Sequence, residues 1–162
     1  MVGLSYNDSV VLLIIFNGSG VPARIAAGYL ADRYFGALNT FVPLFILNAI
    51  LAFSWLGVSG GASLYAYVAI YGLTQSALQA LLPTCISSLT PDVRKTGVRF
   101  GMAWSVMSFA GLTGPPIGGA LLRTDHGSWM PAQVWAGVSM LLGAALVTAA
   151  RMSRFGLQKV KC

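Results

Sequence analysis

Arg24 is the residue in this sequence whose type and position most clearly suggest chemistry. It lies within an apolar stretch, about 10 Å before the stretch ends at Asp32 if the segment is helical. An arginine within a membrane span costs ~2.5–3.5 kcal/mol on insertion scales, and such residues usually face a cavity or a partner. A guanidinium there can bind a carboxylate through two parallel hydrogen bonds. We therefore expect Arg24 to bind an anionic group; the alternative is that its side chain snorkels to the membrane surface.

Three uncharged polar residues also interrupt apolar stretches. Asn17 stands two helical turns before Arg24 and would share its face, whereas Gln75 and Gln79 are one turn apart on another predicted helix. We interpret these three side chains as the lining of a path for a polar solute. The alternative is that they form hydrogen bonds between helices, which contribute ~0.6 kcal/mol on average in membranes.

Asp32 and Arg33 form a charged pair where the first apolar stretch ends. A carboxylate and a guanidinium side by side at a helix junction can bind the N-terminus of a neighbouring helix and so hold one of two conformations. We interpret the pair as part of a gate, and the alternative is an ordinary charged turn.

Catalytic and metal chemistry are not indicated by the sequence. The lone histidine, His126, falls in a predicted loop, and Cys85 and Cys162 lack metal-ligand spacing. An enzyme needs a general base with a positioned partner, and no such pair is evident. We therefore predict no enzyme activity, no metal site and no cofactor.

The composition identifies the elements that must position these residues. Hydrophobic residues make up 56% of the 162 residues and charged residues only 9%, against roughly 25% charged in an average globular chain. This balance excludes a conventional soluble domain and predicts an all-α integral membrane protein. The net charge of +6 is explained by basic loops on the cytoplasmic side of a bilayer, so no nucleic-acid partner is expected.

A spanning helix needs ~20 mainly apolar residues, and five segments qualify. Together they predict a single transmembrane unit over residues 1–162. Two small-residue pairs at the start of the fourth segment and within it, Gly97 with Gly101 and Gly114 with Gly118, have the spacing of close helix contacts. The predicted helices cover about 9–31, 38–56, 63–87, 99–122 and 132–150, followed by a cytoplasmic tail at 151–162.

The basic residues alternate between the two sides of this arrangement. Placing the first turn, the third turn and the tail in the cytoplasm puts eight of the ten there, with Arg24 inside a span and Arg123 outside. The positive-inside rule then predicts an external N-terminus and a cytoplasmic C-terminus. We expect the plasma membrane to be the location.

Several motifs resemble those of the major facilitator superfamily. The pattern Gly28-x-x-x-Asp32-Arg33-x-x-Gly36 resembles a loop signature of that superfamily, and Arg24 four residues earlier resembles the eighth helix of its monocarboxylate-porter-like members. Three further segments resemble the fungal members of that group: Leu82-Pro83-Thr84-Cys85, the run from Gly97 to Met102, and the two-proline, three-glycine run from Leu112 to Leu121.

The resemblance implies helices eight to twelve of a twelve-helix transporter, that is, an incomplete C-terminal half. It implies alternating-access transport of a small organic solute, such as a carboxylate, with Arg24 as the anchor and Asp32 and Arg33 at the inner gate. Gly20 stands where many animal members carry an aspartate that acts as a proton or charge partner. Two alternatives stay open: an inactive remnant, or a small helper protein that moves nothing itself. The expected partners are the solute, the lipid bilayer and a complementary transporter half.

Overall fold

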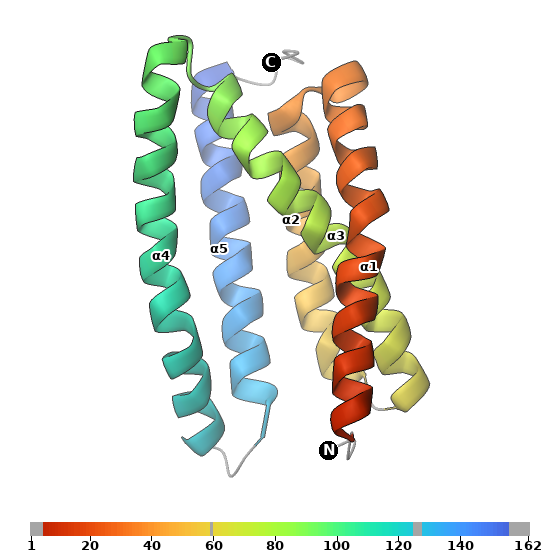
Figure 1. Ribbon diagram of the computed structural model, residues 1–162. Helices are drawn as coiled ribbons and strands as arrows, with labels where there is room; N and C mark the ends of the chain where they lie inside the picture. The colour runs from red at the N-terminus through yellow and green to blue at the C-terminus, as the bar shows by residue number, and fades with distance from the viewer. Residues whose placement is uncertain (1–4, 59, 125–127, 156–162) are drawn as a thin grey trace.

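The described part of the chain is helical, and its five long helices fit the predicted number. The structure, a computed structural model, describes residues 5–58, 60–124 and 128–155, and no strand occurs among them. The long helices alternate in direction along the chain (Figure 1). Their bounds are Tyr6–Leu30 for α1, Ala37–Ser54 for α2, Gly61–Ser88 for α3, Val93–Thr124 for α4 and Met130–Phe155 for α5. The predicted loop residue His126 and the tail from residue 156 to Cys162 lie outside the described residues.

Short polar side chains determine where α1 and α4 begin. Ser5 and Asp8 form a capping box, in which each side chain accepts a hydrogen bond from the other residue's backbone N–H, at 3.3 and 3.1 Å. Asp92 Oδ1 accepts a hydrogen bond of 3.1 Å from the N–H of Arg94. Such caps satisfy backbone donors that have no partner within the helix. As a result, α4 begins before residue 99, the start expected from hydropathy.

A π-helix at Ala31–Phe35 and a single glycine join α1 to α2. The N–H of Gly36 donates to the Ala31 carbonyl at 2.8 Å, the i to i−5 bond of a π-helix. Gly36 itself has φ 81° and ψ 154°, a conformation essentially restricted to glycine. The last glycine of the predicted motif therefore has a backbone role, because it allows the chain to turn directly after Asp32 and Arg33.

Small residues allow α1 and α3 to pack closely. A Cβ added at Gly20 would overlap Ser76 Oγ and lie 2.7 Å from Ser76 Cβ. On α3, a Cβ added at Gly72 would lie 2.6 Å from both the Phe16 carbonyl oxygen and Ser19 Oγ. Close approach of this kind stabilises helix pairs in lipid, where apolar side chains gain little by leaving the bilayer. The contact therefore depends on the two glycines.

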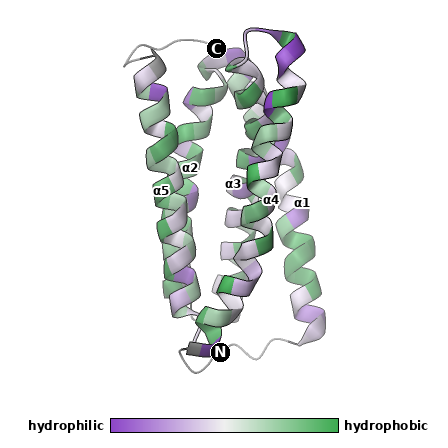
Figure 2. Cartoon of the chain, turned by 90° about the vertical axis from the view of Figure 1, so that its left-hand side faces the viewer, coloured by the Kyte–Doolittle hydropathy of each residue, from purple (hydrophilic) through white to green (hydrophobic). Residues whose placement is uncertain are grey.

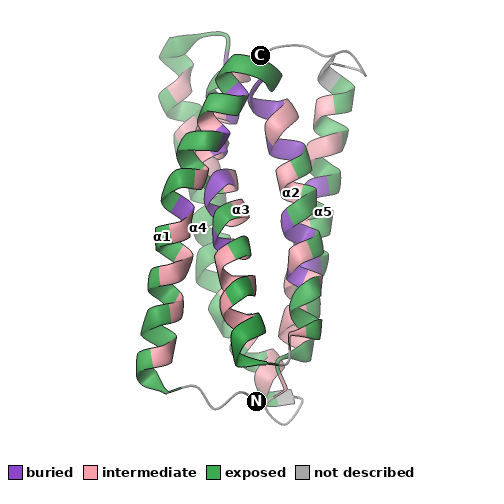
Figure 3. Ribbon diagram, turned by 90° about the vertical axis from the view of Figure 1, so that its right-hand side faces the viewer, coloured by how far each residue is buried: buried purple, intermediate pink, exposed green. Residues whose placement is uncertain are grey.

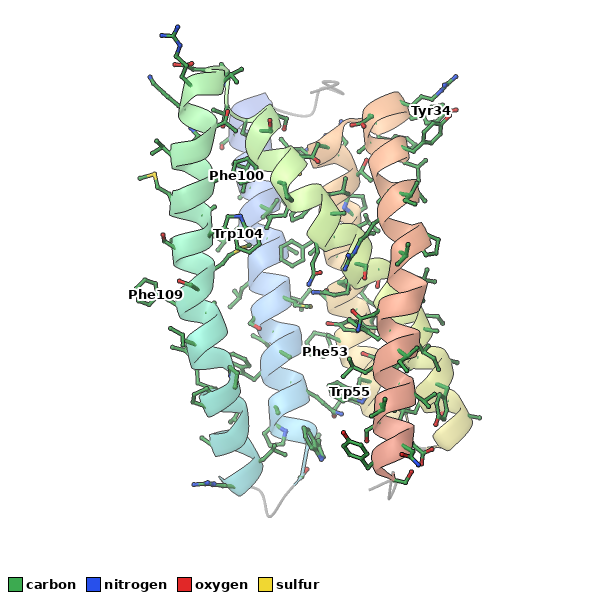
Figure 4. All side chains as sticks on the ribbon, viewed as in Figure 1. Tyr34, Phe53, Trp55, Phe100, Trp104 and Phe109 are labelled. Carbon is green, nitrogen blue, oxygen red and sulfur yellow. The ribbon has the colours of Figure 1, made fainter. Side chains whose placement is uncertain are left out.

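Aromatic rings set against glycines join α2 to α5. A Cβ added at Gly137 would lie 2.7 Å from Cζ of Phe53, and one added at Gly143 would lie 2.9 Å from Cζ of Phe45. Phe53, labelled in Figure 4, thus occupies a notch that any larger residue at 137 would fill. Because α2 also packs against α3, it links α5 to the pair formed by α1 and α3.

The fourth helix is the least packed of the five. It contacts α3 and α5 much less than α1 contacts α3 or α2 contacts α5. The close contacts predicted for its glycines are not found among the described residues: a Cβ added at Gly97, Gly101, Gly114 or Gly118 would meet nothing within 4 Å. Phe109 points away from the other helices in Figure 4. One face of α4 is therefore unpartnered in the described part of the chain.

Apolar side chains cover the outside of the bundle. Leu13, Ile25 and Leu146 are 66%, 71% and 71% exposed. Exposed surface runs along the outer faces of the helices in Figure 3, and much of the helix length is hydrophobic in Figure 2. So many apolar side chains on the outside are suited to contact with the hydrocarbon core of a bilayer. The helical backbone satisfies its own hydrogen-bonding groups in that environment. The surface is that of an integral membrane protein.

Three of the described helices are long and apolar enough to cross a membrane. They cover Tyr6–Phe35, Ala37–Gly57 and Met130–Ser153. The other two long helices are more polar, because α3 carries Gln75 and Gln79 and α4 carries basic residues near both ends. Membrane crossing by α3 and α4 stays a prediction.

The two ends of the bundle differ in charge. The turn after α1, the turn before α4 and the end of α5 lie at one end of the bundle (Figure 1). This end holds Arg33, Arg94, Lys95, Arg99 and Arg151, whereas Arg123 lies at the other end of α4. Basic residues gathered at one end are the pattern that orients a membrane protein, and the side of the membrane on which they lie stays a prediction.

Candidate functional site

Arg24, Gln75 and Gln79 line one cavity of about 750 Å³. Arg24 enters it from α1, the two glutamines enter from α3, and the remaining walls come from α2, α4 and α5. The spacing of the glutamines placed them on one helix face, and the packing of α3 against α1 brings that face to Arg24. Three of the four residues predicted to bind a solute therefore meet at one place.

Arg24 supplies a positive charge without a neutralising partner in the described part of the chain. The ion pair found there joins Lys95 Nζ to Asp92 Oδ2 at 3.9 Å, at the charged end of the bundle. The Arg24 side chain is exposed in the described chain, at the edge of the cavity. A guanidinium has five N–H donors and stays protonated in proteins. It can therefore bind a carboxylate, an enolate or another anionic oxygen in the cavity.

The two glutamines differ in their surroundings. Gln79 is exposed, whereas Gln75 is half-buried. The Oε1 atom of Gln75 is buried and accepts no hydrogen bond from any described residue. An unpaired buried acceptor costs ~1–3 kcal/mol. Hydrogen bonding to a donor brought into the cavity would remove this cost.

Aromatic and apolar side chains form the rest of the wall. Phe41 and Phe45 come from α2, and their rings pack edge to face with centroids 5.6 Å apart. Trp104 and Met107 come from α4, and Figure 4 shows Trp104 directed toward the neighbouring helices. A few polar groups within an apolar lining are typical of sites for organic ligands. The cavity can hold the apolar part of an amphipathic molecule while Arg24 binds its charged part.

Asn17 does not line this cavity. Its side chain is exposed, and Nδ2 donates to the Leu13 carbonyl of the same helix at 2.9 Å. Two turns separate it from Arg24, which is about 10 Å along a helix. A shared face therefore does not bring Asn17 to the site, and its role in binding stays a prediction.

Asp32 and Arg33 are exposed at the charged end of the bundle, outside the cavity. The Arg33 guanidinium lies 5.8 Å from the ring centre of Tyr29 and 5.9 Å from that of Tyr34. Tyr34 projects from the end of the bundle in Figure 4. Cation–π contacts hold Arg33 against its own helical segment, and its predicted role at a gate stays a prediction.

Two polar residues that the sequence analysis did not single out connect α2 with α3 beside the site. Asn48 is fully buried, and its Nδ2 donates to the Leu44 carbonyl at 3.0 Å. Thr74 Oγ1 donates to Asn48 Oδ1 at 3.2 Å. Thr74 is next to Gln75, so this bond helps to fix the part of α3 that faces Arg24. The sequence signal that could have identified Asn48 is the presence of an asparagine within an apolar run.

Comparison with known proteins finds that this chain is similar in sequence to proteins that are named as transporters. It is 38% identical over 150 residues to an MFS-type transporter of Gibberella zeae, a match covering 93% of this chain and 34% of that protein. It is 31% identical over 153 residues to the aspyridones efflux protein of Emericella nidulans, with 94% and 31% covered. The fujikurins efflux protein of Gibberella fujikuroi is 31% identical over 150 residues, with 92% and 32% covered.

These similarities support membership of the major facilitator superfamily. The chain spans about a third of the length of the curated relatives it matches. No family model matches it, and no solved structure matches it significantly. Because the relatives are transporters rather than enzymes, the comparisons also support the prediction that the protein is not an enzyme.

The surroundings of Gly20 explain why a residue without a side chain stands at this position. The resemblance to monocarboxylate porters places Gly20 where many animal members have an aspartate. Here even a Cβ at this position would overlap Ser76 Oγ. An aspartate side chain does not fit between α1 and α3 unless the two helices separate. The contact with Ser76 is a physical reason for the glycine.

Proposed function

We propose that the chain forms part of a major facilitator transporter that exports an amphipathic organic anion. The observation that carries the proposal is the meeting of Arg24, Gln75 and Gln79 on one cavity whose other walls are aromatic and apolar. Arg24 would bind the anionic group and the glutamines would bind neighbouring polar groups. The apolar walls would hold the remainder of the solute.

The names of two relatives support export. One is named for the efflux of aspyridones and another for the efflux of fujikurins. A cavity of about 750 Å³ with two phenylalanines and a tryptophan in its wall suits a solute larger than a short monocarboxylate. A monocarboxylate-porter-like subtype is compatible with the position of Arg24. The comparisons do not favour an inactive remnant or a helper protein.

In an alternating-access cycle of the major facilitator type, the parts of this chain would have the following roles. The chain would supply the last five helices, and the cavity would be completed by a complementary transporter half. Asp32 and Arg33 would contact the other half in one of the two access states. The charged end of the bundle would face the cytoplasm, and the protein would reside in the plasma membrane.

A chimaera tests this proposal. In the aspyridones efflux protein, the matching third is replaced by this chain, and export of aspyridones from cells is measured at matched surface expression. Arg24→Ala should reduce export at least tenfold, because a charge-assisted bidentate contact is lost. Arg24→Lys should restore little, because an ammonium group cannot reproduce the planar fork of the guanidinium.

Arg123→Ala is the matched control, since Arg123 is an exposed arginine that does not line the cavity. It should leave export unchanged. Snorkelling of Arg24 to the membrane surface predicts a different pattern, in which lysine functions well and alanine changes little. Near-normal export by Arg24→Ala would overturn the assignment of Arg24 to the solute.

A further inference from the structure

A second cavity, of about 400 Å³, lies at the charged end of the bundle. Most of its lining is apolar and comes from α2, α3 and α5, with Leu38, Ile86 and Val147 as examples. Two arginines join this lining, Arg99 near the start of α4 and Arg151 near the end of α5. An apolar groove with two cations is suited to a molecule with an acyl chain and an anionic group.

Both arginine side chains have N–H donors that are not used by the described residues and can bind a ligand. Arg99 Nη1 donates to the Leu89 carbonyl at 2.7 Å and approaches Thr90 Oγ1 at 3.4 Å. These contacts hold its guanidinium against the end of α3 and use only one of its nitrogens. Arg151 is half-buried, and its side chain has no hydrogen bond or ion pair with any described residue. The cavity lining contains no aspartate or glutamate, so neither arginine has an acidic partner among the described residues.

We infer that this groove binds an anionic phospholipid, with its phosphate on Arg99 and Arg151 and part of an acyl chain along the apolar wall. Charge complementarity favours an anionic headgroup over a zwitterionic one. Basic pockets between transmembrane helices are suited to anionic headgroups, which are plentiful in the cytoplasmic leaflet. The basic end of the bundle is also the end expected to face that leaflet. A bound lipid would join α4, the least packed helix, to α3 and α5.

The site is distinct from the proposed solute site. Arg24 does not line this groove, and neither Arg99 nor Arg151 lines the larger cavity. The two cavities share three apolar wall residues, Phe41, Leu82 and Val147. Lipid binding should therefore survive Arg24→Ala, whereas export should not. This variant thus distinguishes a failure of the lipid-binding inference from a failure of the proposed transport function.

Native mass spectrometry of the full chain released from nanodiscs provides the test. Nanodiscs contain phosphatidylcholine with or without phosphatidylglycerol, and retained lipid is identified by mass. We expect retained phosphatidylglycerol and little phosphatidylcholine. Each arginine near a membrane surface contributes about 1 kcal/mol to binding of anionic lipid, which is about fivefold in affinity. Arg151→Gln should lower retention about fivefold, and Arg99→Gln with Arg151→Gln about twenty-fivefold.

Arg94→Gln with Lys95→Gln is the matched control. It removes the same charge from the same end of the bundle, but neither residue lines the groove. This control should retain the lipid. Arg151→Gln alone keeps the test valid if loss of the Arg99 contact to α3 impairs folding, which circular dichroism would detect.

Three results would overturn the inference. The first is equal retention of phosphatidylcholine and phosphatidylglycerol. The second is the same loss of lipid in the control as in the arginine variants, because binding would then depend on the general charge of this end. The third is complete competition by inorganic phosphate at concentrations similar to those of the lipid, because the acyl chain would then contribute nothing.

Discussion

Thr74 on α3 donates a hydrogen bond to Asn48 on α2 at 3.2 Å, and Asn48 is inaccessible from outside the chain. The hydroxyl is within reach of two carbonyls of its own helix, those of Ile70 and Tyr71, at 3.3 and 3.1 Å. The hydroxyl has one proton to donate, so its bond to Asn48 competes with these carbonyls and links α3 to α2 when the proton is directed to Asn48 Oδ1. In a bilayer such a polar bridge stabilises a helix pair without solvent to compete for it.

Thr74→Val should loosen the pair formed by α2 and α3. The change removes the bridge while keeping the side-chain shape, so we expect a loss of ~0.6 kcal/mol, with a maximum of about 1.7 kcal/mol. Unfolding in mixed micelles followed by circular dichroism measures it. Thr113→Val is the control, because the Thr113 hydroxyl bonds only to carbonyls of its own helix. Equal losses in the two variants would show that the bridge to Asn48 contributes nothing.

Gly20→Ala should destabilise the contact between α1 and α3. The added methyl group would lie 2.7 Å from Ser76 Cβ, and overpacking of this kind costs about 1–3 kcal/mol. The comparison is Gly18→Ala, where nothing lies within 4 Å and alanine favours the helix by up to about 1 kcal/mol. Melting temperature should fall for the first variant and stay level or rise for the second.

A second-site change checks the cause of the Gly20 effect. Ser76→Gly combined with Gly20→Ala removes the atoms that the new methyl group would meet. Stability should recover relative to Gly20→Ala alone. If the double variant is as unstable as the sum of the two single variants, the clash with Ser76 is not the reason.

Gly36→Ala should disturb the turn that carries Asp32 and Arg33. The φ of 81° with ψ of 154° at Gly36 is essentially available to glycine alone, and this conformation costs other residues about 1–3 kcal/mol. We expect a lower melting temperature and a weaker contact of Arg33 with its tyrosines. Gly57→Ala provides the control, because an added Cβ there meets nothing within 4 Å and its φ is not positive. Equal melting temperatures would contradict the backbone role of Gly36.

The orientation of the charged end can be tested with two introduced cysteines. In a chain whose native cysteines are replaced by serine, Asp92→Cys marks the charged end and Ala62→Cys marks the other, and both positions are exposed. A membrane-impermeant thiol reagent added to intact cells should label only Ala62→Cys. Labelling of Asp92→Cys without permeabilisation would reverse the predicted topology.

The apolar stretches and sparse charge were sufficient to predict a helical membrane protein with five long helices. Helical spacing also placed Gln75 and Gln79 on one face. Spacing alone did not determine which helices meet, so the approach of α3 to Arg24 could be read only from the structure. The same limit explains Asn17, which shares a face with Arg24 but lies too far along the helix to reach the cavity.

Glycines show a second limit of sequence patterns. The pairs at 97–101 and 114–118 have the familiar spacing, yet nothing in the described chain lies close to them. Gly20 and Gly72, which do make close contacts, lie on different helices and have no spacing in common. A helix contact formed by one small residue from each partner leaves no periodic signal in the sequence.

Two phenylalanine rings of α2 lie against two glycines of α5, and together they fix the position of one helix along the other. Phe53 meets Gly137 and Phe45 meets Gly143, so sliding by one turn would require both rings to leave their notches together. We therefore expect these contacts to oppose shear between α2 and α5, so that the two helices move together. The sparsely packed α4 is the helix that we expect to move most easily relative to the others.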